Sequence, residues 1–355
     1  MKMPVRILLI LLCAALIIAL PFTLSAPNML NDVKMELMND EDDGEEIDFG
    51  RLFLSAAWAE EAAEVFEDED LDSGEAAEAS RYVLPLDFSA APAPDADLYT
   101  KDENGQTDGY EDETISVKLE RREMEDGTEM FIAHITIADA SQFRTGVANP
   151  EKVASTRTRT VKAMAKTYNA VIALNGDNFA DAPKKTTFEY RMTQKIRSKA
   201  NNLKDILIID DRGDFHLYIK SQGIDKAPRE LKDAGRSLVN AFTFGPALVK
   251  DGSLLELDAE YGYNPNGREP RAAIGQTGPL SYVMVIIQAK DRNGKSGFSQ
   301  HKLAEFMYEL GCTQAFNLDG GNSAEMVFGD RIIKGMPGGD ERTLSDIIYF
   351  ATAKP

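Results

Sequence analysis

The chain has 355 residues and a formal net charge of −20, and it contains two cysteines and three histidines. Nucleic-acid binding proteins carry a basic footprint, so this acidic chain is not expected to have a nucleic-acid partner. Beyond residue 13 only Cys312 remains, which excludes an intramolecular disulfide and a zinc site built on clustered cysteines. The histidines are widely spaced and in no metal-ligand pattern, so neither a metal nor another cofactor is expected.

The N-terminal 26 residues have the pattern of an export signal. Lys2 and Arg6 precede an uninterrupted apolar run over residues 7–20, and small residues follow the run. The run is short for a membrane-spanning helix, although its extension to Leu24 leaves an uncleaved membrane anchor open. We therefore expect residues 1–26 to be a signal peptide or an N-terminal anchor, and the protein to be exported, either secreted or held at the membrane.

The next segment, residues 27–107, is expected to be an acidic and largely disordered linker. Residues 32–79 contain 19 acidic and two basic side chains, a net charge of −17, whereas residues 80–355 carry a net charge of −5. Blocks of like charge repel one another and stay solvated. The acidity of the chain thus belongs to the linker, and a single folded domain is expected over residues 108–355.

From about Asp108 onward the apolar pattern predicts regular elements. Alternating runs over residues 113–124 and 130–139 predict a hairpin. Residues 149–169 predict a helix that is opened by its Asn-Pro pair. Residues 170–176 then form an apolar run typical of a buried strand.

The second half of the domain continues with strands and one helix. Residues 205–219 predict a hairpin, and residues 238–257 predict a strand pair around a Gly-Pro corner. Residues 282–294 have the apolar density of a central strand. Ser299 is expected to cap a helix whose apolar residues recur at i, i+3, i+4 and i+7, and Gly311 is placed to end it.

Further strands close the chain, over residues 312–318, a hairpin at 326–333, and 345–353. Strands outnumber helices along the domain, and most of them are linked by hairpins. This order predicts an α+β fold, with one domain that has a large mixed, mostly antiparallel sheet and a few covering helices.

Three stretches bring an apolar segment together with polar residues and glycine: residues 173–179, 268–275 and 317–326. The end of a strand is a good place for a reacting group because the sheet behind it fixes its geometry. Each stretch taken alone is also a common turn or surface sequence. Their joint occurrence is what indicates a site.

The residue types in these stretches suggest roles. Asp177 and Asp319 are the best candidates for chemically active carboxylates. The Gly320–Gly321 pair lacks Cβ atoms, so its backbone N–H groups could approach an anion or a sugar hydroxyl. Arg268 and Arg271 offer planar guanidinium groups that suit a phosphate.

The order of these motifs resembles the phosphodiester glycosidase family. The segments ALNGDNF, FGPALVKDG, REPRAAIG, KLAEFMYELGCTQAFNLDGGNSAEM and DERTLSD follow the order and spacing of the family between about Asp108 and Pro355. The most specific part is a helix that ends in Leu-Gly and leads through a strand into Asn-Leu-Asp-Gly-Gly. The resemblance implies an α+β fold whose motif loops converge on one cleft. It also implies cleavage of a sugar from a phosphodiester, which releases the free sugar and leaves a phosphomonoester.

Carried over position by position, the resemblance implies a set of site residues. The family's Asn-Gly turn falls on residues 175–176, its Gly-Pro corner begins at Gly245, and its Arg before Ala-Ile-Gly is similar to Arg271. Its Leu-Asp-Gly-Gly segment falls on 318–321, and its late Glu-Arg…Ser-Asp element resembles 341–346. The predicted catalytic residues are Asp319, Asp177 and Arg271. The predicted substrate-binding residues are Asn175, Gly176, Gly245, Arg268, Gly320, Gly321, Ser323, Arg342 and Asp346.

Two places depart from the family pattern. Asn322 stands where the family often has a third glycine, and Ala324-Glu325 replace small hydroxyl residues. After Asn-Gly, Asp177 and Asn178 take the places of a glycine and an aromatic residue, and only Phe179 fits. The contacts to the sugar and the role of Asp177 therefore follow less directly from the resemblance than the reaction class does.

The residue types are compatible with this reaction. A phosphomonoester has its second pKa at about 6, so it leaves an anomeric carbon with little help from a general acid. Our hypothesis is that Arg271, helped by Arg268 or Arg342, holds the phosphate. Asp319 would act as a nucleophile or as a base that activates water, with Asp177 as the second carboxylate. Retention or inversion depends on the separation of the carboxyl groups, about 5 Å or about 6.5–9.5 Å.

Two other functions stay open at this point. One is a non-catalytic glycan-binding module on a membrane tether. The other is a metal-dependent phosphodiesterase, in which the D-G-G and N-G-D segments would supply oxygen ligands. The expected partner is a glycan or a sugar phosphodiester, and for an exported protein we expect envelope or extracellular phosphoglycans.

Overall fold

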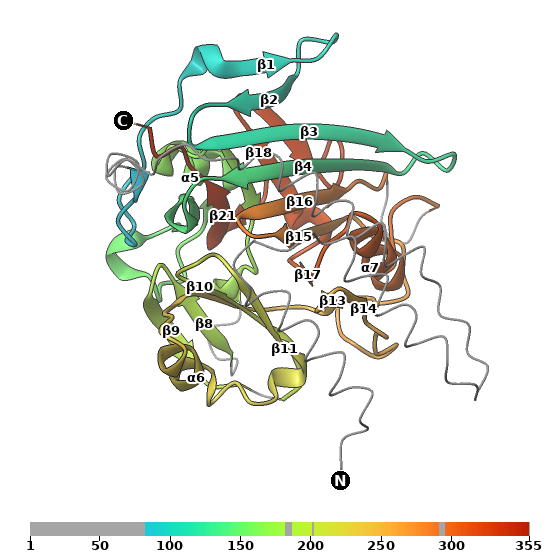
Figure 1. The fold of residues 1–355 in the computed structure, drawn as a ribbon. Helices are drawn as coiled ribbons and strands as arrows, with labels where there is room; N and C mark the ends of the chain where they lie inside the picture. Colours follow the sequence, from blue (N-terminus) through green and yellow to red (C-terminus); the bar gives the residue numbers. More distant parts are fainter. Residues whose placement is uncertain (1–81, 182–186, 201, 291–294, 355) are drawn as a thin grey trace, which may run out of the picture. The chain divides into compact units, whose positions relative to one another are not determined.

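The computed structural model describes residues 82–355 with the exception of 182–186, 201, 291–294 and 355 (Figure 1). The predicted signal or anchor and most of the predicted linker lie outside these residues. The described residues belong to one compact unit, Asp72–Pro355. None of the helices described in that unit is long and apolar enough to cross a membrane.

The strands form three larger sheets and one short ribbon, and every pairing between the described strands is antiparallel. The largest sheet has nine strands, in the order β1 (Tyr99–Lys101), β2 (Thr107–Glu111), β3 (Ile115–Glu123), β4 (Glu129–Ile137), β16 (Ser281–Ile287), β15 (Arg271–Gly278), β17 (Gln314–Asn317), β13 (Ala247–Lys250) and β14 (Ser253–Leu254). Its middle strand, β16, is the one whose apolar density predicted a central position.

Two five-stranded sheets complete the framework. One has the order β11 (Phe215–Tyr218), β10 (Ile206–Asp210), β12 (Leu238–Thr243), β8 (Phe188–Arg191) and β9 (Gln194–Ser198). The other has the order β19 (Arg331–Lys334), β18 (Glu325–Phe328), β7 (Ile172–Asn175), β21 (Asp346–Phe350) and β5 (Phe143–Val147). The ribbon pairs β20 (Thr343–Leu344) with β6 (Arg159–Thr160).

The helices are few and short. In the described part of the chain the α-helices are α5 (Val161–Tyr168), α6 (Ala227–Asp233) and α7 (Gln300–Glu309). Single 3-10 turns link the strands at η2 (Ala96–Leu98), η3 (Ala140–Gln142), η4 (Pro150–Lys152), η5 (Phe179–Asp181), η6 (Ile219–Ser221) and η7 (Gly321–Ser323). This content confirms the predicted α+β class with mostly antiparallel sheet, and the strands are distributed over three sheets.

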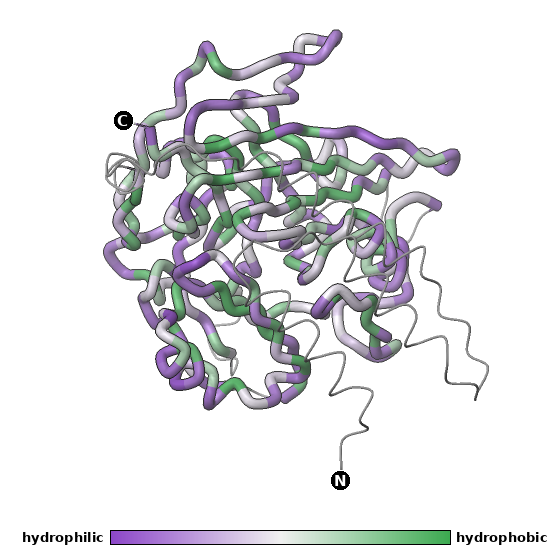
Figure 2. Tube along the Cα trace, in the orientation of Figure 1, coloured by the Kyte–Doolittle hydropathy of each residue, from purple (hydrophilic) through white to green (hydrophobic). Residues whose placement is uncertain are grey.

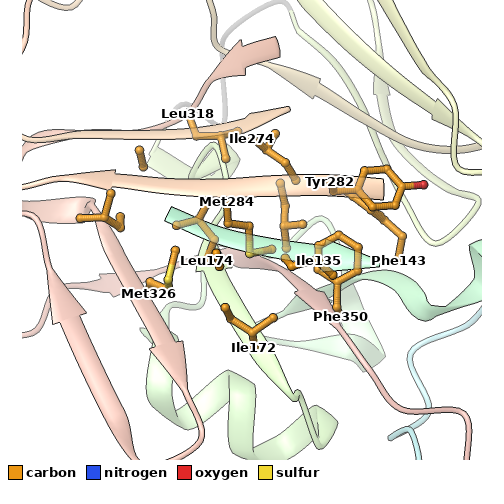
Figure 3. Packing of buried hydrophobic residues seen from close by; sticks show 14 of the residues in the cluster. Ile135, Phe143, Ile172, Leu174, Ile274, Tyr282, Met284, Leu318, Met326 and Phe350 are labelled. Atoms are coloured by element: carbon orange, nitrogen blue, oxygen red, sulfur yellow. The ribbon is translucent and has the colours of Figure 1, made fainter. Parts of the chain in front are cut away.

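The three larger sheets share one hydrophobic core. Ile274 and Met284 come from the nine-stranded sheet, Ile172 and Leu174 from the β7 sheet, and Leu207 from the β10 sheet, and all five side chains are buried in the same cluster. Figure 3 shows members of this cluster packed together from strands far apart in the sequence. Aromatic rings close one end, where Phe143 makes an edge contact with Phe350 at 4.8 Å between ring centroids. Burial on this scale is the main favourable term of folding.

Each of the three larger sheets is covered on its other face by one α-helix. The apolar side of α7 packs on Val285 and Ala273 of the nine-stranded sheet. The α5 helix covers Ala173 and its neighbours on the β7 sheet, and α6 covers Ile208 and its neighbours on the β10 sheet. In Figure 2 the hydrophobic residues follow the central strands, whereas the tip of the β3–β4 hairpin is hydrophilic.

Most predicted elements are confirmed. The β3–β4 and β10–β11 hairpins form as expected, as does the hairpin of β18 and β19. Ser299 caps α7 by accepting a bond from the Lys302 amide, and Gly311 follows the helix with a φ of 78°. Cys312 is buried beneath α7, as a small core residue would be.

The predicted start of α5 is wrong. Pro150 begins only the single turn η4, and the side chain of Asn149 makes no capping bond. The helix starts eleven residues later, at Val161, where the Thr160 hydroxyl accepts a bond from the Ala163 amide. The last two residues before the helix form β6, which pairs with β20 and therefore is not helical.

Two further findings differ from the pattern expected. The Gly245-Pro246 corner, a cis peptide, does not join a hairpin, because β12 and β13 lie in different sheets. Folded structure also begins upstream of the predicted boundary at Asp108. The β1 strand starts at Tyr99 and pairs with β2, and Leu84 is buried against the α5 side of the fold.

Candidate active site

Strand ends from all three sheets meet in one region. The β17 strand ends at Asn317, β7 ends at Asn175, and β8 ends at Arg191. The β21 strand begins there with Asp346, whose carbonyl accepts a bond from the Gly176 amide at 3.1 Å. Most of the residues predicted from the sequence are therefore brought together, although they are far apart along the chain.

The segment after β17, residues 318–325, is here called the Asp319 loop, and backbone bonds fix its start. The Leu318 amide donates to the Ala272 carbonyl at 2.9 Å, and the Gly321 amide donates to the Pro270 carbonyl at 2.8 Å. A Cβ at Gly320 would lie 2.8 Å from the same Pro270 carbonyl, and Gly321 has a φ of 59°. Both glycines are thus required by the path of the chain. The Gly321 amide is used by this contact, and its predicted contact with substrate stays a prediction.

Asn175 joins the Asp319 loop to the β7 sheet. Its side-chain Nδ2 donates to the Asp319 carbonyl at 2.7 Å and to the Gly176 carbonyl at 3.0 Å. Its Oδ1 accepts a bond from the Glu325 amide at 3.1 Å. One buried side chain therefore holds both ends of the loop, and it does so across the boundary between two sheets.

The Gly-Pro corner reaches the same region through β17. The Asn317 side chain donates to the Gly245 carbonyl at 2.8 Å, and its amide donates to the Pro246 carbonyl at 3.0 Å. Gly245 has a φ of 75°, and a Cβ there would lie 2.3 Å from the hydroxyl oxygen of Tyr261. The corner is therefore a fixed wall of the site.

Asp177 and Asp346 belong to a buried group of charges centred on Arg191. With Glu189 they form what we call the ionic cluster: Asp177, Glu189, Arg191 and Asp346. The Arg191 guanidinium donates to Asp177 Oδ1 at 2.6 Å and to Asp346 Oδ2 at 2.8 Å, and Glu189 Oε2 lies 3.4 Å away. The other Asp177 oxygen accepts a bond from the Thr243 amide at 3.0 Å. These charged side chains are all at most 1% exposed.

The electrostatics of the ionic cluster follow from three carboxyl groups around one guanidinium. Burial raises the pKa of Asp346 to about 6, although Arg191 opposes the shift. Burial, and next the charge of Asp177, raise the pKa of Glu189 well above its ordinary value. Burial acts to lower the pKa of Arg191, but the surrounding carboxylates outweigh it and raise that pKa. The guanidinium therefore stays charged, and burial shifts the equilibrium of Glu189 toward its protonated form.

The residues after Asn175, where Asp177 and Asn178 depart from the family pattern, are packed against the ionic cluster. A Cβ at Gly176 would lie 2.1 Å from Asp346 Oδ2, so glycine is required beside the ionic cluster. Asn178 takes a φ of 52°, its amide donates to Asp346 Oδ1 at 3.0 Å, and its side chain accepts a bond from the Ser345 amide at 3.1 Å. Asn178 thus links the N-G-D segment to the Ser345-Asp346 pair.

Arg271 is buried, and the atoms it contacts are carbonyl oxygens. Its Nε donates to Phe298 and its two terminal nitrogens donate to Tyr263, Asn264 and Gly267, all at 2.8–3.0 Å. Burial lowers its pKa to about 10. The guanidinium therefore fixes the loop over residues 263–267, and its predicted contact with a phosphate stays a prediction.

The other predicted cations, Arg268 and Arg342, make different contacts. Arg268 pairs with Asp126 and donates to the Gly297 carbonyl at 3.1 Å. Arg342 donates to the Ser323 hydroxyl at 2.6 Å and lies at the far end of the loop. Of these two, only Arg342 is linked directly to a residue of the loop.

Glu325 closes the Asp319 loop with an unusual carboxyl group. Its residue is 3% exposed, and its Oε1 has no hydrogen-bond partner among the described atoms. Burial, and next the charge of Glu341, raise its pKa to about 7, although Lys334 and Lys162 oppose the shift. In the part of the chain that the structure describes, no group of three or more His, Cys, Asp or Glu side chains is arranged to hold a metal ion.

The family assignment rests on the same strands and loops. A family model of the phosphodiester glycosidases matches residues 168–351, just over half of the chain, from the last residue of α5 through β21. The chain belongs to the phosphodiester glycosidase family. The matched residues include Asn175, the ionic cluster, Arg271 and the Asp319 loop.

Two similar proteins extend the comparison. The catalytic domain of zebrafish N-acetylglucosamine-1-phosphodiester alpha-N-acetylglucosaminidase, auto-inhibited by a pro-peptide, has a similar fold: the TM-score is 0.52 at 13% identity, over 74% of this chain and 86% of that one. The SPbeta prophage-derived uncharacterized protein YomE of Bacillus subtilis is 24% identical over 200 residues. That match spans 56% of this chain and 30% of the longer relative.

Sequence reasoning missed Arg191 and Glu189, which complete the ionic cluster. A signal for them was present, because two opposite charges two residues apart share one face of a strand, and β8 is otherwise aromatic (FEYR). Asn317 begins the third motif stretch, but no role was predicted for its side chain, which donates to the Gly245 carbonyl.

Proposed function

We propose that this protein is a hydrolase that cleaves the glycosidic C–O bond of a sugar-1-phosphodiester. The observation that carries the proposal is the set of hydrogen bonds that holds the backbone of the Asp319 loop. The Ala272 carbonyl holds the backbone just before Asp319, and Asn175 and the Pro270 carbonyl hold it just after, in a member of the phosphodiester glycosidase family. A carboxylate fixed by a rigid scaffold is what stabilisation of an oxocarbenium-like transition state requires.

The leaving group explains why such a site functions without a histidine acid. Cleavage between the anomeric carbon and the phosphate oxygen expels a phosphomonoester, whose second pKa is about 6. It leaves as an anion at neutral pH, so the main demands are a carboxylate near the anomeric carbon and a cation near the phosphate. Water adds to the anomeric carbon, and its protons end on the sugar hydroxyl and in the buffer.

Asp319 is the reacting carboxylate in this proposal, either as the nucleophile or as the base that activates water. Asp177 is bonded to Arg191 and to the Thr243 amide, which supports a role as the second carboxylate that positions the site and sets its field. The buried Arg191 compensates the charge of Asp177 and Asp346, so a negative charge on Asp319 is not opposed by two further uncompensated carboxylates.

The natural substrate is proposed to lie outside the cytoplasm. The support is the apolar run over residues 7–20 and the acidic segment over 32–79, which together have the pattern of an exported and tethered protein. Envelope or extracellular glycans that carry sugar-1-phosphodiester links are the substrate class that fits both the family and this location.

The test is an incubation of the full chain, in detergent, with a panel of sugar-1-phosphodiesters. The proposal expects free sugar and a phosphomonoester in equal amounts. Release of a sugar phosphate would show P–O cleavage, the reaction of a phosphodiesterase, and would contradict it. Saturable binding without any release would identify a glycan-binding module and would contradict it as well.

A further inference from the structure

A cleft lies between the η6 turn, which follows β11 of the β10 sheet, and two parts of the nine-stranded sheet. These parts are the start of β13 and the segment that follows β14. The cleft has a volume of about 330 Å³, within the range of small-ligand pockets, about 300–1,000 Å³. None of the predicted catalytic or substrate-binding residues is among those that line it. We call it the corner cleft, because its lining includes Pro246 of the Gly-Pro corner.

The η6 wall of the corner cleft has an unusual backbone. Lys220 and Ser221 are consecutive residues with φ values of 48° and 57°, in the left-handed region that residues other than glycine rarely adopt. Asp205 Oδ1 accepts a bond from the Lys220 amide at 2.7 Å, and the Ser221 hydroxyl donates to the Lys204 carbonyl at 2.7 Å. A backbone of this kind persists only where its surroundings hold it, and such backbones cluster at ligand-binding sites.

Asp205 joins this wall to the Gly-Pro corner. Its other carboxylate oxygen accepts a bond from the Ala247 amide at 2.8 Å, and its own amide donates to the Tyr261 hydroxyl at 2.9 Å. That hydroxyl donates in turn to the Phe244 carbonyl at 2.7 Å. Asp205 is 4% exposed and both of its oxygens bond backbone amides, so it supports the walls of the cleft.

The corner belongs to the candidate active site as well as to the cleft. Asn317, two residues before Asp319, bonds the carbonyls of the middle two residues of the segment 244–247. The cleft residues Asp205 and Tyr261 bond the outer two residues of the same segment. One short segment, bonded at every residue, is therefore a wall of both the cleft and the candidate site.

The lining of the corner cleft combines buried apolar residues with exposed charges. Pro246 and Leu257 are among the buried apolar residues. Lys220, Glu256 and Asp258 are exposed, and the Lys220 ammonium lies 3.2 Å from Asp258 Oδ2. Two carboxylates outnumber one ammonium in this exposed part of the lining, which disfavours a phosphate or another anion.

An uncharged sugar fits this combination of groups. Hydroxyls both donate and accept hydrogen bonds, so those of a sugar can accept from an ammonium and donate to carboxylates. The C–H faces of the ring can pack on buried apolar side chains, which form most of the lining of small-molecule pockets. An uncharged ring also meets no repulsion from the carboxylates.

We propose that the corner cleft is a subsite for an uncharged sugar unit. The Lys220 ammonium donates to hydroxyls of the sugar, and the Glu256 and Asp258 carboxylates accept from them. These bonds replace part of the contact between Lys220 and Asp258, an exposed pair of the kind that contributes little to stability. In the substrate, the unit is a further sugar of the glycan and not the one that is released. This assignment to the substrate rests on the proposed function, whereas the binding of a sugar does not.

The binding test uses three methyl α-pyranosides, those of glucose, mannose and galactose, with the full chain in detergent. Saturation-transfer difference NMR measures their affinity. At least one of them is expected to bind the wild type saturably. Lys220→Met and Asp258→Asn are each expected to weaken that binding by about tenfold, the effect of losing one hydrogen bond to a charged group.

The matched controls lie on α6, where Arg229 and Asp233 form another exposed pair, at 3.6 Å. Arg229→Met and Asp233→Asn are expected to bind the glycoside like the wild type, and thermal unfolding reports whether each variant keeps its fold. A wild type that binds none of the three glycosides would overturn the subsite. So would Lys220→Met and Asp258→Asn variants that bind like the wild type, or inorganic phosphate that displaces the glycoside from the wild type.

Turnover separates this inference from the proposed function. If the glycoside binds through Lys220 but no phosphodiester releases sugar, the proposed reaction fails and the subsite stands. If sugar is released but no glycoside binds, the reaction stands and the subsite fails. When both hold, Lys220→Met is expected to raise KM about tenfold more for a phosphodiester that carries a further sugar unit than for one that carries a single sugar. An equal rise for the two substrates would overturn the assignment of the bound sugar to the substrate.

Discussion

The ionic cluster and the Asp319 loop meet at Asn175, yet different forces hold them. In the ionic cluster, Arg191 bonds carboxylates whose side chains are at most 1% exposed. In the Asp319 loop, the contacts that fix the chain are made by backbone atoms, at Leu318 and Gly321 and through Asn175. A change in the charge of the Asp319 carboxylate during a reaction would therefore leave these backbone bonds in place. The comparison assigns a supporting role to one set of carboxylates and leaves the reacting role to the other.

The largest expected effect comes from breaking the ionic cluster. Arg191→Leu leaves Asp177 and Asp346 buried without their cation, and removal of one partner from a buried ion pair costs about 3–5 kcal/mol of stability. Urea unfolding measures this loss. The control is Arg229→Leu on α6, whose exposed pair with Asp233 at 3.6 Å is expected to contribute less than about 0.5 kcal/mol. A loss below about 1 kcal/mol for Arg191→Leu would contradict the account of the cluster.

The Asp319 loop should respond to pH through Glu325. The ordinary pKa of this carboxyl is 4.5, and the folded state raises it to about 7. Between these values the native state binds more protons than the unfolded state, so stability falls as the pH rises, by up to about 3 kcal/mol from this group. Below pH 4.5 Glu325 is protonated in both the folded and the unfolded state and does not change the stability. Above pH 7 the full loss of stability is present.

Glu325→Gln should remove that slope. Urea unfolding of the wild type and the variant at pH 5 and pH 8 provides the measurement. We expect the variant to gain stability over the wild type at pH 8 and to differ less at pH 5. Equal pH dependence in the two proteins would show that Glu325 ionises normally in the folded state.

Arg271 and Arg191 are both buried, but Arg271 donates to carbonyl oxygens and Arg191 donates mainly to carboxylates. Replacing Arg271 shows how much stability each kind of bond contributes. Arg271→Met removes hydrogen bonds to Tyr263, Asn264 and Gly267 but leaves no carboxylate unpaired, so we expect a loss of about 2 kcal/mol, smaller than for Arg191→Leu. Sugar release should fall as well, because the loop over residues 263–267 is no longer fixed. Urea unfolding and kcat/KM together measure both effects. Full stability with lost activity would instead support direct binding of the phosphate by Arg271.

The smallest expected effect lies at the glycines of the Asp319 loop. Gly320→Ala places a Cβ 2.8 Å from the Pro270 carbonyl, and we expect a loss of about 1–2 kcal/mol from this overpacking. Gly278→Ala in β15 is the matched control, because nothing lies within 4 Å of a Cβ there. Thermal unfolding of both variants gives the comparison. An equal effect at the two positions would show that the close approach at Gly320 is not limiting.

The fold class could be predicted from the sequence because alternation and turn residues determine it locally. The β3–β4 hairpin and the cap of α7 at Ser299 are of this kind. The start of α5 was predicted wrongly because Asn149 and Pro150 have the composition of a cap without its bonds, whereas Thr160 makes them. The division of the strands into three sheets could not be predicted, because it depends on which apolar faces meet in the core.

The candidate site was predicted in its motifs but not in its connections. The D-G-G segment and Asn175 were found, since glycine and amide at strand ends are visible in the sequence. The bond from Asn175 to the Asp319 carbonyl was not, because it joins residues 144 positions apart. Arg191 was missed for the same reason: its partners Asp177 and Asp346 lie on other strands.

The central claim is that Asp319 is the reacting carboxylate of a sugar-1-phosphodiester hydrolase. The most direct measurement compares free-sugar release by the wild type and Asp319→Asn, with urea unfolding as the check on the fold. Because the loop is held by backbone bonds, we expect the variant to keep its stability within about 1 kcal/mol. Its kcat is expected to fall by a factor on the order of 100 or more. A folded Asp319→Asn variant that releases sugar at the wild-type rate would contradict the account.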